Sequence, residues 1–281
     1  MGDLILQHDI HMHTNLSLCA PRETTMATYL SLCEEEKISL LGFSDHLYYD
    51  HHLERRGITG ETGLERVLKI REEMERMKDK TPVRMLLGCE VENFFGQPES
   101  LLPGEAGVFD YVLIAASHIM NHTKEYEKFD LTTPDKLRKM VMEQSVRACE
   151  LEYPVPAGIC HPLYPIVSPW EQEVVDGMTN AQLEECFKLA ASKGKSIEIH
   201  ACLYRNGTRL DKEGLSPSYL RLLCIAKECG CKFHFGSDAH NAEQFRGKHK
   251  LLLRAAERAG ITSEDMWSVV QTTKEDKLIY V

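Results

Sequence analysis

The sequence predicts an α/β protein built on a closed barrel of parallel strands, and three observations support this fold class. Short apolar segments alternate with amphipathic segments of helical length along the 281 residues, as in repeated βα units. Crossovers of that length join parallel rather than antiparallel strands. Polar residues of ligand type follow many strands at the same end, whereas an open sheet would concentrate them at one switch point.

Seven buried strands are expected, and the first contains the apolar run Leu4, Ile5 and Leu6. The expected strands cover residues 4–12, 39–43, 83–91, 110–116, 156–160, 196–201 and 232–236. Amphipathic segments predict helices between these strands and after the last one. The expected helices cover residues 24–37, 62–79, 134–149, 179–193, 216–229, 248–259 and 263–271.

Capping residues mark several of the expected helix boundaries. Thr133 and Ser216 are each followed by a proline, which is favoured at the first helical position. Thr179 begins a capping box, with a glutamine three residues later. Gly194 and Gly230 stand where helices are expected to stop, and each is followed within a few residues by a new strand.

Three long irregular stretches are expected to form the walls of a site, at residues 47–61, 92–109 and 161–178. The sequence shows no internal repeat and no linker rich in Pro, Gly or Ser that would divide it. We therefore expect a single barrel domain over residues 1–281.

The composition is that of a globular protein, with 43% hydrophobic and 27% charged residues and a formal net charge of -10. A nucleic-acid groove needs a basic footprint, so this charge argues against a polynucleotide ligand. No apolar run reaches the roughly 18 residues of a membrane span, and the N-terminus lacks the features of a secretion signal. A cytoplasmic protein with reduced thiols is expected, since the 10 Cys include no CxxC pair.

His11 and His13 lie at the end of the first expected strand. Side chains on a strand alternate with a period of two residues, so both imidazoles point to one face. Together they can bind one metal ion, provided that other strands supply the remaining ligands.

Each of the other expected strands also ends near a histidine or an acidic residue. Seven of the 13 His occupy these ends, where chance placement would scatter them over helices and surface loops. Imidazoles and carboxylates that face one pocket suit Zn²⁺, Mn²⁺ or Fe²⁺, and their number exceeds the needs of one ion. A site of two or three metals is predicted, with Glu90 as a bridging carboxylate. The candidates are His11, His13, His46, Glu90, His118, His161, His200, Asp238 and His240.

These motifs, in this order along the chain, resemble those of the polymerase-and-histidinol-phosphatase (PHP) family. The resemblance covers residues 9 to about 245. It implies a distorted (βα)7, TIM-like barrel with a cluster of two or three divalent metals at the C-terminal end of the barrel. The motifs that carry it are His11-Met12-His13-Thr14, Asp45-His46, Gly88-x-Glu90, Ser117-His118, His161-Pro162 and Ser237-Asp238-Ala239-His240.

The resemblance also implies which residues bind each metal. The first metal would be held by His11, His13, Glu90 and Asp238, the second by Glu90, His118 and His161, and the third by His46 and His240. Many members of the family have a further histidine or acid a few residues after the His-x-His motif, and here Cys19 falls in that stretch. The third site is therefore expected to be ligated by Cys19, weakly occupied or empty.

A cluster of this kind predicts hydrolysis of a phosphomonoester by a hydroxide that the metals activate, without a protein nucleophile. Asp238 or His200 is expected to carry the proton. Arg205 is placed to bind a phosphate bidentately. Arg246 and His122 are further candidates for substrate binding.

Within the resemblance, the size of a free-standing barrel favours the histidinol-phosphatase branch, whose substrate is L-histidinol phosphate in histidine biosynthesis. Two alternatives remain open. The first is a PHP hydrolase that acts on another small phosphate, a nucleotide or a phosphodiester. The second is a barrel that binds metals without turnover. The sequence contains no signal for the oligomeric state.

Overall fold

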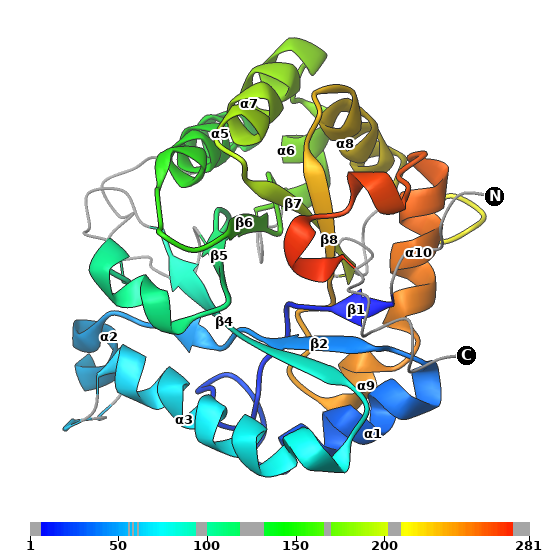
Figure 1. The fold of residues 1–281 in the computed structure, drawn as a ribbon. Coiled ribbons are helices and arrows are strands. Elements are labelled where there is room, and N and C mark those ends of the chain that lie inside the picture. The colour runs from blue at the N-terminus through cyan, green and yellow to red at the C-terminus, as the bar shows by residue number, and fades with distance from the viewer. Residues whose placement is uncertain are drawn as a thin grey trace.

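The computed structural model describes residues 7–55, 57, 59–60, 62–93, 100–118, 132–165, 170–201 and 209–271. Eight parallel strands form a nearly closed barrel with helices between them, so the predicted fold class is confirmed (Figure 1). The strand order is β1-β2-β4-β5-β6-β7-β8, and the short β3 pairs with β4 beyond the end of β2. The strands are β1 (His8–Asp9), β2 (Leu40–Phe43), β3 (His46–Leu47), β4 (Arg84–Glu92), β5 (Tyr111–Ala115), β6 (Ala157–Cys160), β7 (Ser196–His200) and β8 (Lys232–Gly236).

The helices lie outside the barrel and cover its strands (Figure 1). The α-helices are α1 (Met26–Glu36), α2 (Asp50–Arg55), α3 (Gly63–Met77), α5 (Pro134–Glu150), α6 (Glu171–Asp176), α7 (Asn180–Ser192), α8 (Pro217–Glu228), α9 (Ala242–Phe245) and α10 (Lys248–Arg258). Two 3₁₀ turns, η1 (Lys78–Lys80) and η2 (Pro103–Val108), precede β4 and β5. The short elements α2, η2 and α6 fall within the stretches that were expected to be irregular.

The expected caps are present. Thr133 and Ser216 each accept a hydrogen bond from the backbone N–H three residues later, with proline at the first helical position of α5 and α8. Thr179 and Gln182 form the reciprocal bonds of a capping box at α7. Gly194 follows the end of α7 with φ +64°, a left-handed conformation that favours glycine. Each cap lets the chain reverse into the next strand.

The barrel closes between β1 and β8, the first and last strands. The backbone N–H of Ile10 donates to the Phe235 carbonyl at 3.1 Å, and that of Asp238 donates to the His11 carbonyl at 2.8 Å. The first strand was expected over residues 4–12, but β1 pairs with β2 over only two residues, His8 and Asp9.

Tyr111 fills the barrel below the site. Its ring is fully buried and its hydroxyl donates to the Ile10 carbonyl at 2.6 Å, so it links β5 to β1 across the interior. Gly88 of β4 makes room for it, because a Cβ at that position would lie 2.2 Å from the ring.

One expected helix is wrong. Residues 263–271 form two short 3₁₀ turns, η5 (Ser263–Asp265) and η6 (Ser268–Val270). Between them Met266 forms a parallel bridge with Phe233 of β8, and the Trp267 backbone N–H donates to the Phe233 carbonyl at 2.8 Å. This pairing with the sheet holds the segment extended at Met266, which sequence periodicity does not reveal.

None of the helices in the described part of the chain combines the length and the apolar composition that crossing a bilayer requires.

Candidate metal centre

The site lies at the C-terminal ends of the strands, where the sequence placed it. The parallel pairing of β3 with β4 places two of the candidate residues side by side, since His46 of β3 stands opposite Glu90 of β4. The remaining residues follow strands that meet at the same end of the barrel, and Cys19 comes from the loop after β1. The structure brings together His11, His13, Cys19, His46, Glu90, His118, His161, His200, Asp238 and His240.

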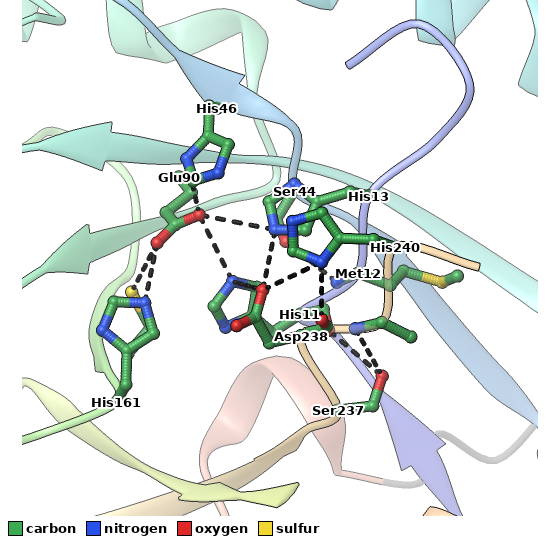
Figure 2. A network of polar contacts seen from close by, with 12 residues as sticks. His11, Met12, His13, Ser44, His46, Glu90, His161, Ser237, Asp238 and His240 are labelled. Atoms are coloured by element: carbon green, nitrogen blue, oxygen red, sulfur yellow. Dashed lines mark hydrogen bonds and ion pairs between the residues drawn. The ribbon is translucent and has the colours of Figure 1, made fainter. Parts of the chain in front are cut away.

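The carboxylate of Glu90 stands at the centre of this group and is fully buried. Figure 2 shows it facing the imidazoles of His46 and His161. Its Oε1 lies 2.8 Å from His161 Nε2 and 3.5 Å from His118 Nε2. Its Oε2 lies 2.9 Å from His46 Nδ1, 3.4 Å from His11 Nε2 and 3.5 Å from His13 Nε2.

Three of these imidazoles are held from behind, through the ring nitrogen that points away from Glu90. An acceptor on the outer nitrogen fixes the tautomer, so that the inner nitrogen presents its lone pair to an ion. This is the usual arrangement of metal-binding histidines. The pairs are His11 Nδ1 with Glu198 Oε1 at 2.6 Å, His118 Nδ1 with Glu92 Oε2 at 3.1 Å, and His161 Nδ1 with Ser117 Oγ at 2.6 Å.

Asp238 forms the other side of the group. Its Oδ1 lies 3.0 Å from His13 Nε2 and 3.7 Å from His11 Nε2. Asp238 and His161 both adopt left-handed backbone conformations, with φ 52° and φ 33°. Residues other than glycine rarely adopt these angles, and such positions cluster at functional sites, where the surrounding structure enforces them.

The surroundings hold the pKa values of the Glu90 and Asp238 carboxyls well below their usual range. Burial raises the pKa of Glu90, but His46, His118 and His11 lower it by more, so that the net pKa lies well below its usual value. Burial likewise raises the pKa of Asp238, and the hydrogen bond from His13 with the charge of His11 brings it well below its usual value. The negative charge that cations require is therefore present without a change of protonation.

The imidazoles and the thiol respond to these charges in different directions. Burial alone would lower the pKa of His11, but Glu198 and Glu90 hold it well above its usual value. For His161 burial dominates and lowers the pKa to about 4. Burial raises the pKa of the Cys19 thiol, but the charge of His13 and hydrogen bonds from the neighbouring imidazoles lower it to about 4.

The residues present fit divalent metal ions. Among the described residues, His11 Nε2, His13 Nδ1 and Glu90 Oε2 are buried atoms that form no hydrogen bond. A buried polar atom without a partner costs about 1–3 kcal/mol, so such atoms gathered in one place call for a ligand. Five groups of three or four side chains each bring ligand atoms within 4.8 Å of one another. Imidazole and carboxylate donors of this kind suit Zn²⁺, Mn²⁺ or Fe²⁺.

Two residues of the site had no predicted role, Glu198 and Glu92. Glu198 accepts from His11 Nδ1 and also from the His161 backbone N–H at 2.5 Å, so it holds two metal-ligand candidates. A Cβ at position 236 would lie 1.8 Å from Glu198 Oε1, which explains Gly236. The signal was available: Glu198 stands two residues before His200, and Glu92 two after Glu90, so each pair shares one strand face.

Other predicted residues stand in a different relation to the centre. His200 is fully buried, and its Nδ1 lies 3.2 Å from Glu198 Oε2. Arg246 lies after α9 and is exposed, where its guanidinium pairs with Glu35 at 3.1 Å. Its predicted role in substrate binding stays a prediction, and the predicted Arg205 and His122 lie outside the described residues.

The fold and the cluster define a parallel α/β barrel with a candidate metal centre at its mouth. Two solved structures with similar folds are described as histidinol phosphatases, one of them as a putative one. Histidinol phosphate phosphatase from Lactococcus lactis, solved with zinc, L-histidinol and phosphate, matches with a TM-score of 0.63 and 16% identity over 96% of this chain and 99% of that one. The putative histidinol phosphatase from Listeria monocytogenes matches with a TM-score of 0.60 and 14% identity over 86% of this chain and 99% of that one.

No protein-family model and no curated protein sequence matches the chain. The likeness is therefore one of fold. The barrel type that the sequence motifs implied is the one that the structure shows.

Proposed function

We propose that the protein is a metal-dependent phosphatase that hydrolyses a small phosphomonoester. One observation carries the proposal: three histidines from three strands each direct one ring nitrogen to Glu90 while a separate side chain holds the opposite nitrogen. An arrangement built only for stability has no need of this second layer, because neutral or apolar groups fill a barrel core at lower cost.

Two adjacent ions fit the ligand atoms that gather around Glu90. His11, His13 and Asp238 lie on one side of its carboxylate, and His118 and His161 on the other. When bound, divalent cations supply Lewis acidity, which neutralises phosphate oxygens and makes water a better nucleophile at neutral pH.

The protein's own groups have defined tasks in this proposal. Glu198 keeps the proton on His11 Nδ1, so that Nε2 stays a ligand. Asp238, ionised and 9% exposed, is the group at the mouth that can take a proton at a carboxylate oxygen from an attacking water. His200 touches Glu198 and is placed to stabilise its charge.

For the particular substrate we propose L-histidinol phosphate. The support is the likeness of fold to a histidinol phosphate phosphatase that binds L-histidinol and phosphate. The net charge of -10 disfavours a polynucleotide, which approaches through long-range electrostatics. A small ester bound by cations avoids that repulsion.

The test uses the full chain loaded with Zn²⁺ or Mn²⁺ and compares three esters. These are p-nitrophenyl phosphate, bis-p-nitrophenyl phosphate and L-histidinol phosphate. The proposal expects release from both monoesters, with the highest kcat/KM for L-histidinol phosphate. Metal content by elemental analysis accompanies each assay, so that an empty site is not mistaken for an inactive one.

The outcomes separate the alternatives. No release from any ester at full metal occupancy would overturn the phosphatase and leave a barrel that binds metal without turnover. Faster release of p-nitrophenol from the diester than from the monoester would indicate that the protein is a phosphodiesterase. Release from p-nitrophenyl phosphate without release from L-histidinol phosphate would keep the phosphatase and reject the substrate.

A further inference from the structure

One group of candidate ligands differs in composition from the other four. Four groups combine imidazoles with carboxylates, and one of them adds a thiol. The fifth consists of His13, Cys19, His46 and His240, three imidazoles and a thiol without a carboxylate. We call this group the thiol corner. Each of its members offers one ligand atom, and these atoms lie within 4.8 Å of one another.

The imidazoles of the thiol corner are oriented by their surroundings. His240 Nδ1 lies 2.9 Å from the backbone carbonyl of Asp238, which fixes the proton there and leaves Nε2 as the lone-pair nitrogen. The His13 ring packs against those of His46 and His240, with centroids 4.5 Å and 4.3 Å away. His13 is fully buried, and its Nδ1 forms no hydrogen bond with any described residue.

Cys19 is exposed, but the loop that carries it is held to the barrel. The hydroxyl of Thr14 donates to Asp45 Oδ2 at 2.7 Å, and its backbone N–H donates to Oδ1 at 2.6 Å. The Leu16 carbonyl accepts from Arg66 Nη2 at 3.1 Å. These bonds hold the start of the loop against the barrel, and Cys19 lies beside the histidines.

We propose that Cys19 supplies a thiolate ligand to a third metal ion, bound with His46 and His240 beside His13, and that this position selects Zn²⁺ or Co²⁺ over Mn²⁺. The proposal rests on the proposed metal centre, but not on which ester the protein hydrolyses.

The donor set decides the selectivity. Thiolate is a soft ligand that favours zinc-like ions, whereas Mn²⁺ and Mg²⁺ favour carboxylate and water oxygens. Zn–N bonds of about 2.0–2.1 Å and Zn–S bonds of about 2.3 Å put tetrahedral ligand atoms roughly 3.3–3.6 Å apart. Ligand atoms within 4.8 Å reach that spacing by small rotations of side chains. The positions around Glu90 offer carboxylate oxygens beside the imidazoles, and the thiol corner offers none, so two kinds of metal position share one mouth.

Absorption of the cobalt form tests the proposal, because a thiolate bound to Co²⁺ gives a charge-transfer band in the near ultraviolet. The full chain is stripped with a chelator and titrated with Co²⁺. We expect the band to appear, to be lost on adding stoichiometric Zn²⁺ and to persist in excess Mn²⁺. The Cys19→Ser variant should bind Co²⁺ at the remaining positions without the band.

Two other cysteines serve as controls. Cys160 is fully buried with its Sγ 3.5 Å from Glu90 Oε1, and it is the other thiol in the candidate groups of described residues. Cys224 of α8 is a half-buried thiol outside the candidate groups of described residues. Cys160→Ala and Cys224→Ser should both keep the band. Loss of the band in Cys160→Ala and its retention in Cys19→Ser would overturn the proposal, as would a cobalt-saturated parent without a band.

Alkylation gives a second readout that does not depend on activity. Iodoacetamide converts a thiolate to a thioether, with the sulfur displacing iodide, and peptide mass spectrometry locates the product. Cys19 of the stripped protein should react, and Zn²⁺ but not Mn²⁺ should protect it. Equal reaction with and without Zn²⁺ would contradict ligation. An inactive protein with the cobalt band and zinc protection would reject the phosphatase and keep this site.

Discussion

Buried histidines occur in two regions of the barrel, and their partners differ. At the mouth, His11 and His118 each contact a carboxylate through both ring nitrogens. Beneath the mouth, His234 of β8 contacts the hydroxyl of Ser196 at 2.9 Å, and His8 of β1 accepts from the Phe235 backbone N–H at 2.9 Å. His8, His11 and His234 are all fully buried.

The comparison shows that burial alone does not identify a functional histidine. Burial lowers the pKa of His234 to about 4, whereas carboxylates hold the pKa of the equally buried His11 well above its usual value. A buried histidine with a neutral partner packs as part of the core. A buried histidine that faces a carboxylate with one ring nitrogen, and is held by an acceptor at the other, is oriented to bind a cation. Substitutions in the two regions should therefore have separate effects.

The largest effect is expected from Glu90→Gln. Removing the shared carboxylate should lower phosphatase turnover by on the order of 10³-fold, because several kcal/mol of charge stabilisation depend on the bound ions. Metal content should fall with it. The matched control is Glu72→Gln on the exposed face of α3, which should change neither quantity. Full metal content in Glu90→Gln would remove Glu90 from the ligand set.

Metal removal should destabilise the mouth and leave the core region intact. A ligand at about 100–1,000 times its Kd stabilises a protein by about 3–4 kcal/mol. Chelation should therefore lower the Tm of the parent by about 5–10 °C. In Glu90→Gln the chelator should have little effect on Tm. An unchanged Tm of the parent, measured by calorimetry at matched ionic strength, would argue against ions that bridge the strands.

His234→Gln tests the core region through pH. A pKa lowered to about 4 means that the folded state keeps His234 neutral, so its contribution is complete above about pH 6.5 and is lost as pH falls toward 4. The full loss is about 3 kcal/mol, at 1.36 kcal/mol per pKa unit. Denaturant unfolding of the metal-free parent and variant measures the free energy of unfolding at each pH. Between pH 6.5 and 4 this free energy should fall by about 3 kcal/mol less in His234→Gln than in the parent. Turnover at neutral pH should stay near that of the parent.

The smallest effect is expected from Glu198→Ala, which distinguishes a residue that orients a metal ligand from a residue that binds the metal itself. Glu198 orients His11 but belongs to the layer behind it, so metal affinity should fall about 10–100-fold without abolishing binding. Glu185→Ala on the exposed surface of α7 is the control. Metal titration measures both. A loss as large as that of Glu90→Gln would make Glu198 a ligand itself.

Much of the fold and the site follows from local patterns. Parallel strands bring their ends together at one edge, so residues that end strands, such as Glu90 and Asp238, are neighbours in space although far apart in sequence. Helix boundaries followed caps such as Thr179, because these bonds form within a few residues.

What the sequence did not reveal depends on contacts between distant segments. The extended conformation at Met266 requires Phe233 of β8, and no periodicity within 263–271 encodes that partner. Glu198 was visible as a residue at a strand end, but its role depends on the His11 ring that faces it. The ion pair of Arg246 with Glu35 of α1 is likewise a contact between segments far apart in sequence, and no local pattern encodes it.

Closure of the barrel between β1 and β8 has a consequence for biosynthesis. The Asp238 backbone N–H meets the His11 carbonyl across 227 positions of sequence, and the carboxylate of Asp238 belongs to the same group of candidate ligands as His11 and His13. A ribosome that adds about 5–20 residues per second needs roughly 10–45 s to cover that interval. The nascent His-x-His pair thus waits for Asp238, and a metal that needs both as ligands would bind only after the last strand of the barrel has been made.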